Sequence, residues 1–315
     1  MKLATTTSTV LDYVGHDIEK TLEIFSKSRF RYLDYSFDGG YRLNQILRDN
    51  YLDEVEPALR AAEKYGMKFV QSHAPSVDPV EGKYPYEQVI DIMNRCIEIC
   101  GKLSIPNMVV HSTASPKYLI NQKGDKQRYM EDMAKFYRDL MPACERNNVI
   151  VLAENSCRAN MGNKYFPDRG YELAELVDAV GSPFMGAVWD TGHAACDNVN
   201  QYDDIMQLGK RLKALHVHDN FNGKDKHQPP FIGFMDGDGL MQGLIDSGYE
   251  GEYFTFEAKL LLYLRYVNDP KRPEHFGKHG NGSLRGPLPE LVEAELEYLY
   301  EIGKYMLESY GLYEE

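Results

Sequence analysis

The sequence lacks several features that mark particular classes of protein. It holds no run of about eighteen apolar residues, so we expect no membrane-spanning helix. Met1 to Val10 carry one lysine and a threonine-rich run in place of an apolar segment, which argues against a signal peptide. The five cysteines form no Cys-x-x-Cys pair, and an odd number of this kind is typical of reduced cysteines in a cytoplasmic protein.

Positive charge is also scarce. The chain has 35 Lys and Arg against 48 Asp and Glu, which gives a net charge of -13 over its 315 residues. Proteins that bind phosphate backbones usually carry a basic face. The composition therefore argues against nucleic acid as a partner and favours a small molecule.

One pattern is repeated along the whole chain, with no linker and no low-complexity block. Short β-rich runs alternate with longer stretches of helical period, which is typical of βα units and a parallel sheet. The eight runs that we predict as strands are Lys2–Thr6, Tyr32–Ser36, Met67–His73, Asn107–His111, Val149–Glu154, Phe184–Asp190, Leu212–His218 and Tyr253–Glu257.

The intervening stretches carry signals of helices and of helix ends. Residues Leu52 to Tyr65 have apolar side chains at helical spacing and are followed by Gly66, a residue typical of helix ends. Gly101, Gly181 and Gly248 follow other helical stretches in the same way.

Eight βα units in this length predict an α/β fold, a (β/α)8 TIM barrel forming a single domain over residues 1–315. A last helix, roughly Leu288 to Tyr310, is expected to close the barrel. A doubly wound open sheet is the structural alternative. No glycine-rich phosphate fingerprint follows the first strand, which disfavours that alternative.

Two of the predicted loops are enlarged, and both leave the end of the barrel where active sites are built. Asp219 to Asp238 follow the seventh strand, and Leu260 to Pro289 follow the eighth. The second loop carries Lys278, His279 and Arg285, which are candidate lid or phosphate contacts. A charged, glycine-rich loop is more often only solvated, so both interpretations stay open.

Six consecutive predicted strands finish in or next to an ionisable side chain. A single histidine or carboxylate at a strand end is more often structural than functional. Burying so many in one cavity is costly unless something pairs them, and a divalent cation does so economically. The residues are His73, His111, Glu154, Asp190, His216 with His218, and Glu257.

The donor types narrow the choice of metal only in part. Glu154, Asp190, Glu257 and one histidine make an oxygen-rich set that suits one Mn²⁺, Mg²⁺, Co²⁺ or Zn²⁺ ion. Additional imidazoles would favour zinc. Alternation along a strand turns His216 and His218 to the same side, so the pattern leaves either as the ligand.

The segments Trp189–His193 and His216–Asn220, with the strand-end set, resemble the xylose isomerase-like TIM barrels. That superfamily holds sugar phosphate isomerases and epimerases, ketose 3-epimerases, inosose dehydratases and endonuclease IV. The resemblance spans the third strand to Tyr253–Glu257. It implies that Glu154, Asp190, His216 and Glu257 hold the metal, as in ketose 3-epimerases. It also implies that His193 contacts the substrate.

Endonuclease IV has further ligands for a three-zinc cluster, and this chain has a match for each. The resemblance thus leaves a multinuclear zinc site open. Two positions depart from the epimerase pattern: Asn160 stands where an acid is expected, and Asn222 where an arginine is expected. We therefore infer no particular ketose. The matching residues are His73, His111, His193, Asp225 and His227.

These residues suggest a divalent-metal-dependent isomerase or epimerase that acts on a sugar or polyol. Glu154 and Glu257 would remove and return a proton next to a carbonyl, through an enediolate that the cation stabilises. The same residues would serve a dehydratase. The alternatives are a zinc phosphodiesterase similar to endonuclease IV and a sugar-sensing barrel without catalysis. Barrels of this kind commonly form homo-oligomers.

Overall fold

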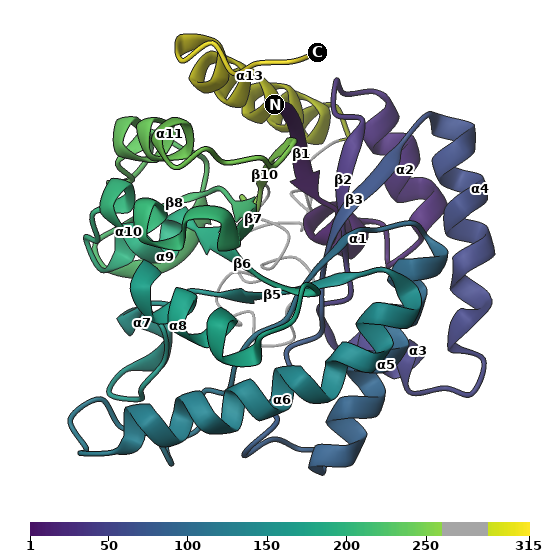
Figure 1. The fold of residues 1–315 in the computed structure, drawn as a ribbon. Coiled ribbons are helices and arrows are strands. Elements are labelled where there is room, and N and C mark those ends of the chain that lie inside the picture. Colours follow the sequence, from purple (N-terminus) through teal and green to yellow (C-terminus); the bar gives the residue numbers. More distant parts are fainter. Residues whose placement is uncertain (260–288) are drawn as a thin grey trace, which may run out of the picture.

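The computed structural model describes residues 1–259 and 289–315. Eight parallel strands stand side by side in the order β10-β1-β2-β3-β4-β5-β6-β7, and helices surround them (Figure 1). The strands are β1 (Lys2–Thr6), β2 (Tyr32–Ser36), β3 (Lys68–His73), β4 (Asn107–Val109), β5 (Ile150–Glu154), β6 (Met185–Asp190), β7 (Leu212–His216) and β10 (Tyr253–Phe256). The predicted TIM barrel is confirmed.

The barrel closes through a short contact between β7 and β10. The Val217 amide donates to the Thr255 carbonyl oxygen at 2.8 Å, and the Glu257 amide donates to the Val217 carbonyl oxygen at 3.1 Å. Val217 and Phe256 thereby form an isolated parallel bridge beyond the end of β7. The seam brings the ends of the seventh and eighth barrel strands together.

Helices follow the strands in the alternation that the sequence predicts. Most of them pack on the outside of the barrel, and α13 lies beside the N-terminus (Figure 1). In the described part of the chain, no helix is long and apolar enough to cross a membrane. The α-helices are α1 (Ser8–Tyr13), α2 (Ile18–Ser26), α3 (Gly40–Ile46), α4 (Val55–Tyr65), α5 (Tyr86–Lys102), α6 (Asp125–Asn147), α7 (Arg158–Met161), α8 (Gly170–Val180), α9 (Thr191–Cys196), α10 (Gln201–Leu208), α11 (Gly237–Asp246) and α13 (Pro289–Ser309), with short 3-10 turns at Tyr51–Glu54 and Gly209–Arg211.

The glycine signals mark three helix ends correctly and one wrongly. Gly66, Gly181 and Gly248 have φ values of 65°, 68° and 66°, the left-handed conformation that ends a helix. Gly101 instead lies inside the last turn of α5. A Cβ atom there would lie 2.8 Å from the Asn147 side chain, so a close contact with the end of α6 requires the glycine.

The enlarged segment predicted from Asp219 to Asp238 is present, and its first half contains a hairpin that the sequence did not predict. An antiparallel hairpin occupies it, with β8 (Asp219–Phe221) paired to β9 (Lys224–Gln228). Its turn is Asn222–Gly223, both at positive φ, and Asn-Gly is the sequence best suited to such a turn. The flanking strands are polar, so they lack the apolar alternation that would have predicted them.

Inside the barrel, the layer below the strand ends has two different halves. On β4 to β7 the inward side chains form a small apolar cluster of their own, made of Val109, Leu152, Val188 and Ala214. On β2, β3 and β10 the side chains two residues before the inward-facing Ser36, His73 and Glu257 are polar. They are Asp34, Gln71 and Thr255, each at most 2% exposed.

Candidate metal centre and active site

Four predicted donors meet at the carboxyl ends of four strands. Glu154, Asp190 and His216 are the last residues of β5, β6 and β7, and Glu257 directly follows β10. One donor atom from each lies within 4.8 Å of the others. His216 is central, because its Nδ1 lies 2.7 Å from Glu154 Oε1 and 3.2 Å from Glu257 Oε2. We call these residues the inner group.

The charged side chains of the inner group shift one another's pKa values strongly. Burial alone would lower the pKa of His216, but Glu257 and Glu154 raise it to about 10. Burial raises the pKa of Glu257, yet His216 and His227 lower it to about 2. Three carboxylates therefore surround one imidazole in a buried pocket. This donor set suits a divalent cation, which would replace the proton on His216 and neutralise the acids.

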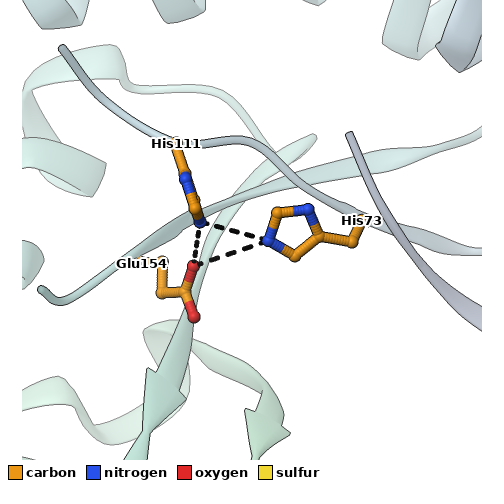
Figure 2. Close-up of side chains that lie close together, drawn as sticks. All are labelled: His73, His111 and Glu154. Atoms are coloured by element: carbon orange, nitrogen blue, oxygen red, sulfur yellow. Dashed lines mark hydrogen bonds and ion pairs between the residues drawn. The ribbon is translucent and has the colours of Figure 1, made fainter. Parts of the chain in front are cut away.

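A second group consists of His73, His111 and Glu154, whose side chains point toward one another (Figure 2). It shares Glu154 with the inner group. Nε2 of His111 lies 2.7 Å from Glu154 Oε2 and 3.1 Å from Nε2 of His73. Nδ1 of His73 lies 2.8 Å from the Ala74 carbonyl oxygen. A carbonyl only accepts, so Nδ1 carries the proton and Nε2 is free to bind a metal.

A third group consists of His193, Asp225 and His227. The Asp225 carboxylate lies 3.5 Å from His193 Nε2 and 3.3 Å from His227 Nε2. Burial opposes ionisation of Asp225, but these two histidines hold its pKa far below the usual range. In both rings Nδ1 lies about 3 Å from a carbonyl oxygen, of Asn155 for His193 and of Glu257 for His227. In both rings Nε2 is therefore the nitrogen that can bind a metal ion. We call the second and third groups the outer groups.

His218, which the sequence left as an alternative to His216, takes a different place. Its Nε2 lies 2.8 Å from Asp190 Oδ2, and its ring stacks on His227 at 4.0 Å. A Cβ on Gly192 would lie 2.0 Å from the His218 ring, so only glycine fits there. His218 also belongs to a possible metal-binding group with His227 and Glu257. Only His216 contacts both glutamates of the inner group.

Two asparagines, for which we predicted no role, position the donors. Asn155 Nδ2 donates to the Asp190 carbonyl oxygen at 2.9 Å, and Asn155 Oδ1 accepts from the Asp190 amide at 2.7 Å. Asn220 Oδ1 accepts from the His227 amide at 3.0 Å, and its Nδ2 donates to Asp225. Each asparagine directly follows an acidic residue, a signal that could have identified them.

Glu154, Glu257 and the residues of the outer groups line a cavity of about 330 Å³, whereas Asp190 and His216 are not part of its lining. Lys259 and Asp38 also line it. Lys278 and Arg285, predicted as lid or anion contacts, lie outside the described residues. Hydroxyl groups supply much of the remaining wall, from Thr6, Ser8, Ser36, Ser76, Ser112, Tyr129 and Ser156.

The two departures from the epimerase pattern have different surroundings. Asn160 lines the cavity and donates to Asp225 Oδ2 at 3.0 Å, so it supports the third donor group. Asn222 lies in the hairpin turn and is exposed, outside the described lining of the cavity. Asn160 is therefore placed to contact a molecule bound in the cavity, whereas Asn222 is outside the described lining.

The model of the family described as xylose isomerase-like TIM barrel matches residues 22–273. The chain belongs to this family. An uncharacterized protein, y4fM, of Sinorhizobium fredii is 24% identical over 271 residues, covering 78% of this chain and 83% of that protein. Fructoselysine 3-epimerase of Escherichia coli O157:H7 is 31% identical over 121 residues, which are 38% of this chain and 40% of the relative.

The solved structure of a D-tagatose 3-epimerase-like protein superposes with a TM-score of 0.70 at 17% identity. The superposition covers 99% of this chain and 98% of that one. At this identity the likeness shows the fold. It agrees with the family in giving the chain a xylose isomerase-like TIM barrel.

Proposed function

We propose that this protein is a divalent-metal-dependent isomerase or epimerase of a sugar or polyol derivative. The observation that carries the proposal is the position of two carboxylates. Glu154 and Glu257 both line the cavity, and both contact the same ring nitrogen of His216 at 2.7 and 3.2 Å. Two acids from separate strands thus face one space in which a small substrate can bind.

The inner group would hold the cation, and Glu154 and Glu257 would also move protons. One carboxylate takes the proton from the carbon next to the substrate carbonyl, and the other returns a proton to the opposite face. A bound cation would supply the positive charge that stabilises the enediolate oxygens. His193 lines the same cavity and is our candidate for a substrate contact.

The lining of the cavity supports a polyhydroxylated substrate. Seven hydroxyl-bearing side chains face a space of about 330 Å³, and such groups both donate and accept hydrogen bonds. The names of two similar proteins, fructoselysine 3-epimerase and D-tagatose 3-epimerase-like protein, describe enzymes of this substrate class. Return of the proton to the same carbon gives epimerisation, and return to the neighbouring carbon gives isomerisation. Loss of a β-hydroxyl would give dehydration.

Exchange of a substrate proton with solvent tests the proposal. Metal-loaded protein is incubated with a panel of ketoses in D₂O, and deuterium next to the carbonyl is followed by NMR. We expect incorporation for at least one ketose, and loss of incorporation in Glu154→Gln and Glu257→Gln. Glu250→Gln is the matched control, because Glu250 is an exposed acid at the opposite end of β10. Deuterium incorporation that persists in both active-site variants would refute the two-base mechanism.

The second candidate function is phosphodiester hydrolysis similar to that of endonuclease IV. The outer groups favour it, since they bring all nine donors implied by that resemblance into three adjoining clusters. The net charge of -13 opposes it, because nucleic acid binding depends on Lys and Arg contacts to phosphate. Cleavage of a duplex with one abasic site by the zinc-loaded protein would support this candidate.

Three further properties remain predictions. A cytoplasmic location follows from the cysteine pattern, and fractionation of cells would test it. Extension of one domain over residues 1–315 is testable by limited proteolysis. A homo-oligomer is testable by light scattering during gel filtration.

A further inference from the structure

Asp34 is a buried carboxylate whose nearest polar neighbour on the paired strand is the neutral Gln71 side chain, which lowers the pKa of Asp34 slightly. It lies on β2 and is 1% exposed. In the described part of the chain, neither carboxylate oxygen forms a hydrogen bond of normal distance and angle, and no positively charged side chain pairs with it. Burial of a carboxylate without a partner strongly destabilises a fold, so a charge in this position needs an explanation.

The place of Asp34 in the barrel is directly beneath the donors. Side chains alternate along a strand, so Asp34 faces inward with Ser36, one layer below it. Ser36 pairs in register with His73, and both line the cavity. Asp34 itself pairs with Gln71, the residue below His73. Asp34 thus occupies the layer immediately under the floor of the metal centre.

The barrel does not need a charge in this layer for packing. The corresponding positions under Glu154, Asp190 and His216 are Leu152, Val188 and Ala214. Gln71 and Thr255, the polar members of the layer, are neutral. A leucine would suit the interior at position 34 as it does at position 152. Asp34 therefore has a role that an apolar residue would not fill.

His216 is a central donor whose described contacts use only one of its two ring nitrogens. Its hydrogen bond to Glu154 and its ion pair with Glu257 both use Nδ1, and Nε2 lies on the far edge of the ring. A histidine that binds a metal through one nitrogen usually donates the other N–H to a carboxylate, a carbonyl or water. In the layer below the inner group, the one charged acceptor among the described residues is Asp34.

We propose that Asp34 is a positioning residue that holds His216 from beneath, through its Nε2–H, directly or through one buried water molecule. This inference rests on the proposed function, since it makes Asp34 part of the support of the metal centre. The carboxylate fixes the ring orientation and the tautomer with Nδ1 free for the cation. It also adds a negative charge under the centre, which strengthens cation binding.

The electrostatics of the two residues agree with this arrangement. Burial raises the pKa of Asp34 to about 6, and among the neighbouring charges His216 opposes that rise most, followed by His73. Asp34 in turn is one of the groups that raise the pKa of His216. The two side chains are therefore electrostatically coupled across the barrel interior.

The test separates support of the metal from support of the fold. Dissociation constants for Mn²⁺ and Zn²⁺ are measured by competition with a chelating dye for the unaltered protein, Asp34→Asn and Asp34→Leu. Melting temperatures are measured without metal. Thr255→Val is the matched control, because Thr255 is a neutral polar residue of the same layer whose hydroxyl also lacks a partner.

We expect Asp34→Leu to weaken metal binding by about 10- to 100-fold, as is typical for partners of metal-binding histidines. The metal affinity of Asp34→Asn should lie between those of Asp34→Leu and the unaltered protein, since its amide oxygen can still accept a hydrogen bond from Nε2–H. The metal-free melting temperature of both variants should stay close to that of the unaltered protein, because Glu154 and Glu257 still pair with His216 and the desolvation cost of a buried carboxylate is removed. Thr255→Val should bind metal as the unaltered protein does.

Two results would overturn the inference. One is unchanged metal affinity in Asp34→Leu and Asp34→Asn while the unaltered protein binds metal. The other is a lowered metal-free melting temperature with unchanged affinity, which would make Asp34 structural. Failure of the unaltered protein to bind either metal would instead refute the proposed function, and this inference with it.

Discussion

The inner and outer donor groups are built in different ways. Three inner residues, Glu154, Asp190 and His216, end strands, and the barrel seam fixes the fourth, Glu257. The outer groups share Glu154 and His73 with the sheet but otherwise use residues beyond it. His111 lies two residues past β4 with its side chain 43% exposed, and Asp225 and His227 are on the hairpin.

This difference shows which part of the centre the fold itself determines. The register of hydrogen-bonded strands sets the inner group, so its geometry depends little on loops. The outer groups depend on segments that can change while the barrel stays intact. We therefore expect the inner group to hold one cation by itself, and the outer groups to decide whether further ions bind.

The largest expected effect comes from removing an inner carboxylate. We predict that Glu154→Gln and Glu257→Gln each lower turnover by about 10²- to 10⁴-fold, the usual contribution of a general acid or base. The measurement is kcat on whichever ketose exchanges deuterium, with circular dichroism as the check on folding. A loss of less than about tenfold in either variant would contradict the two-base account.

The next largest effect is expected in the dependence of metal affinity on pH. The metal-free pKa of His216 is about 10, and a metal needs the neutral ring, so binding releases a proton below that pH. Metal affinity should rise about tenfold per pH unit until pH approaches 10. Calorimetry in buffers of different ionisation enthalpy counts the protons, and zero protons released would contradict the proposed role of His216.

The stability of the metal-free fold should change with pH in the opposite direction. The raised pKa of His216 stabilises the fold most below the ordinary value of 6.5, and this contribution is lost as pH rises through about 10.

Metal removal should have a moderate effect on stability that depends on the inner group alone. A cation at about 100 times its Kd stabilises the fold by about 2.7 kcal/mol, which is a shift of several degrees in melting temperature. We predict this shift for the unaltered protein and for His227→Ala, and its loss in Glu257→Gln. Scanning calorimetry with and without chelator measures it. Loss of the shift in His227→Ala would mean that the outer donors are needed for the main site.

The smallest effect is predicted for His73→Ala. If the inner group carries the chemistry alone, turnover should stay within about threefold of the unaltered protein. If a multinuclear centre is needed, the same substitution should nearly abolish activity. Steady-state kinetics at saturating metal separates the two results. A severe loss of turnover would favour the phosphodiesterase interpretation over the isomerase one.

Much of this arrangement could be predicted from the sequence, because a parallel barrel places strand ends together. The first two strands were predicted with correct bounds, and the inner donors meet as expected. The predicted strands ending at His111 and His218 each overshoot by two residues. In both segments, an ionisable residue lies past the last backbone hydrogen bond to the neighbouring strand. Residue types alone do not show where these hydrogen bonds stop.

Other features depend on tertiary contacts that a pattern of residue types does not contain. The hairpin escaped prediction because its strands face solvent and the cavity instead of a core. Asp34 stands in a short strand like any other polar residue, and only the closed barrel shows that it is buried beneath the donors. The binding of metal by the predicted residues stays a prediction that the geometry supports.

Metal content per chain tests the central claim most directly. Elemental analysis is performed on protein purified without chelator and again after reloading with Mn²⁺, Co²⁺ or Zn²⁺. The account predicts one divalent ion per chain, lost in Glu257→Gln and retained in His73→Ala. Close to three zinc ions per chain, or none in any preparation, would contradict it.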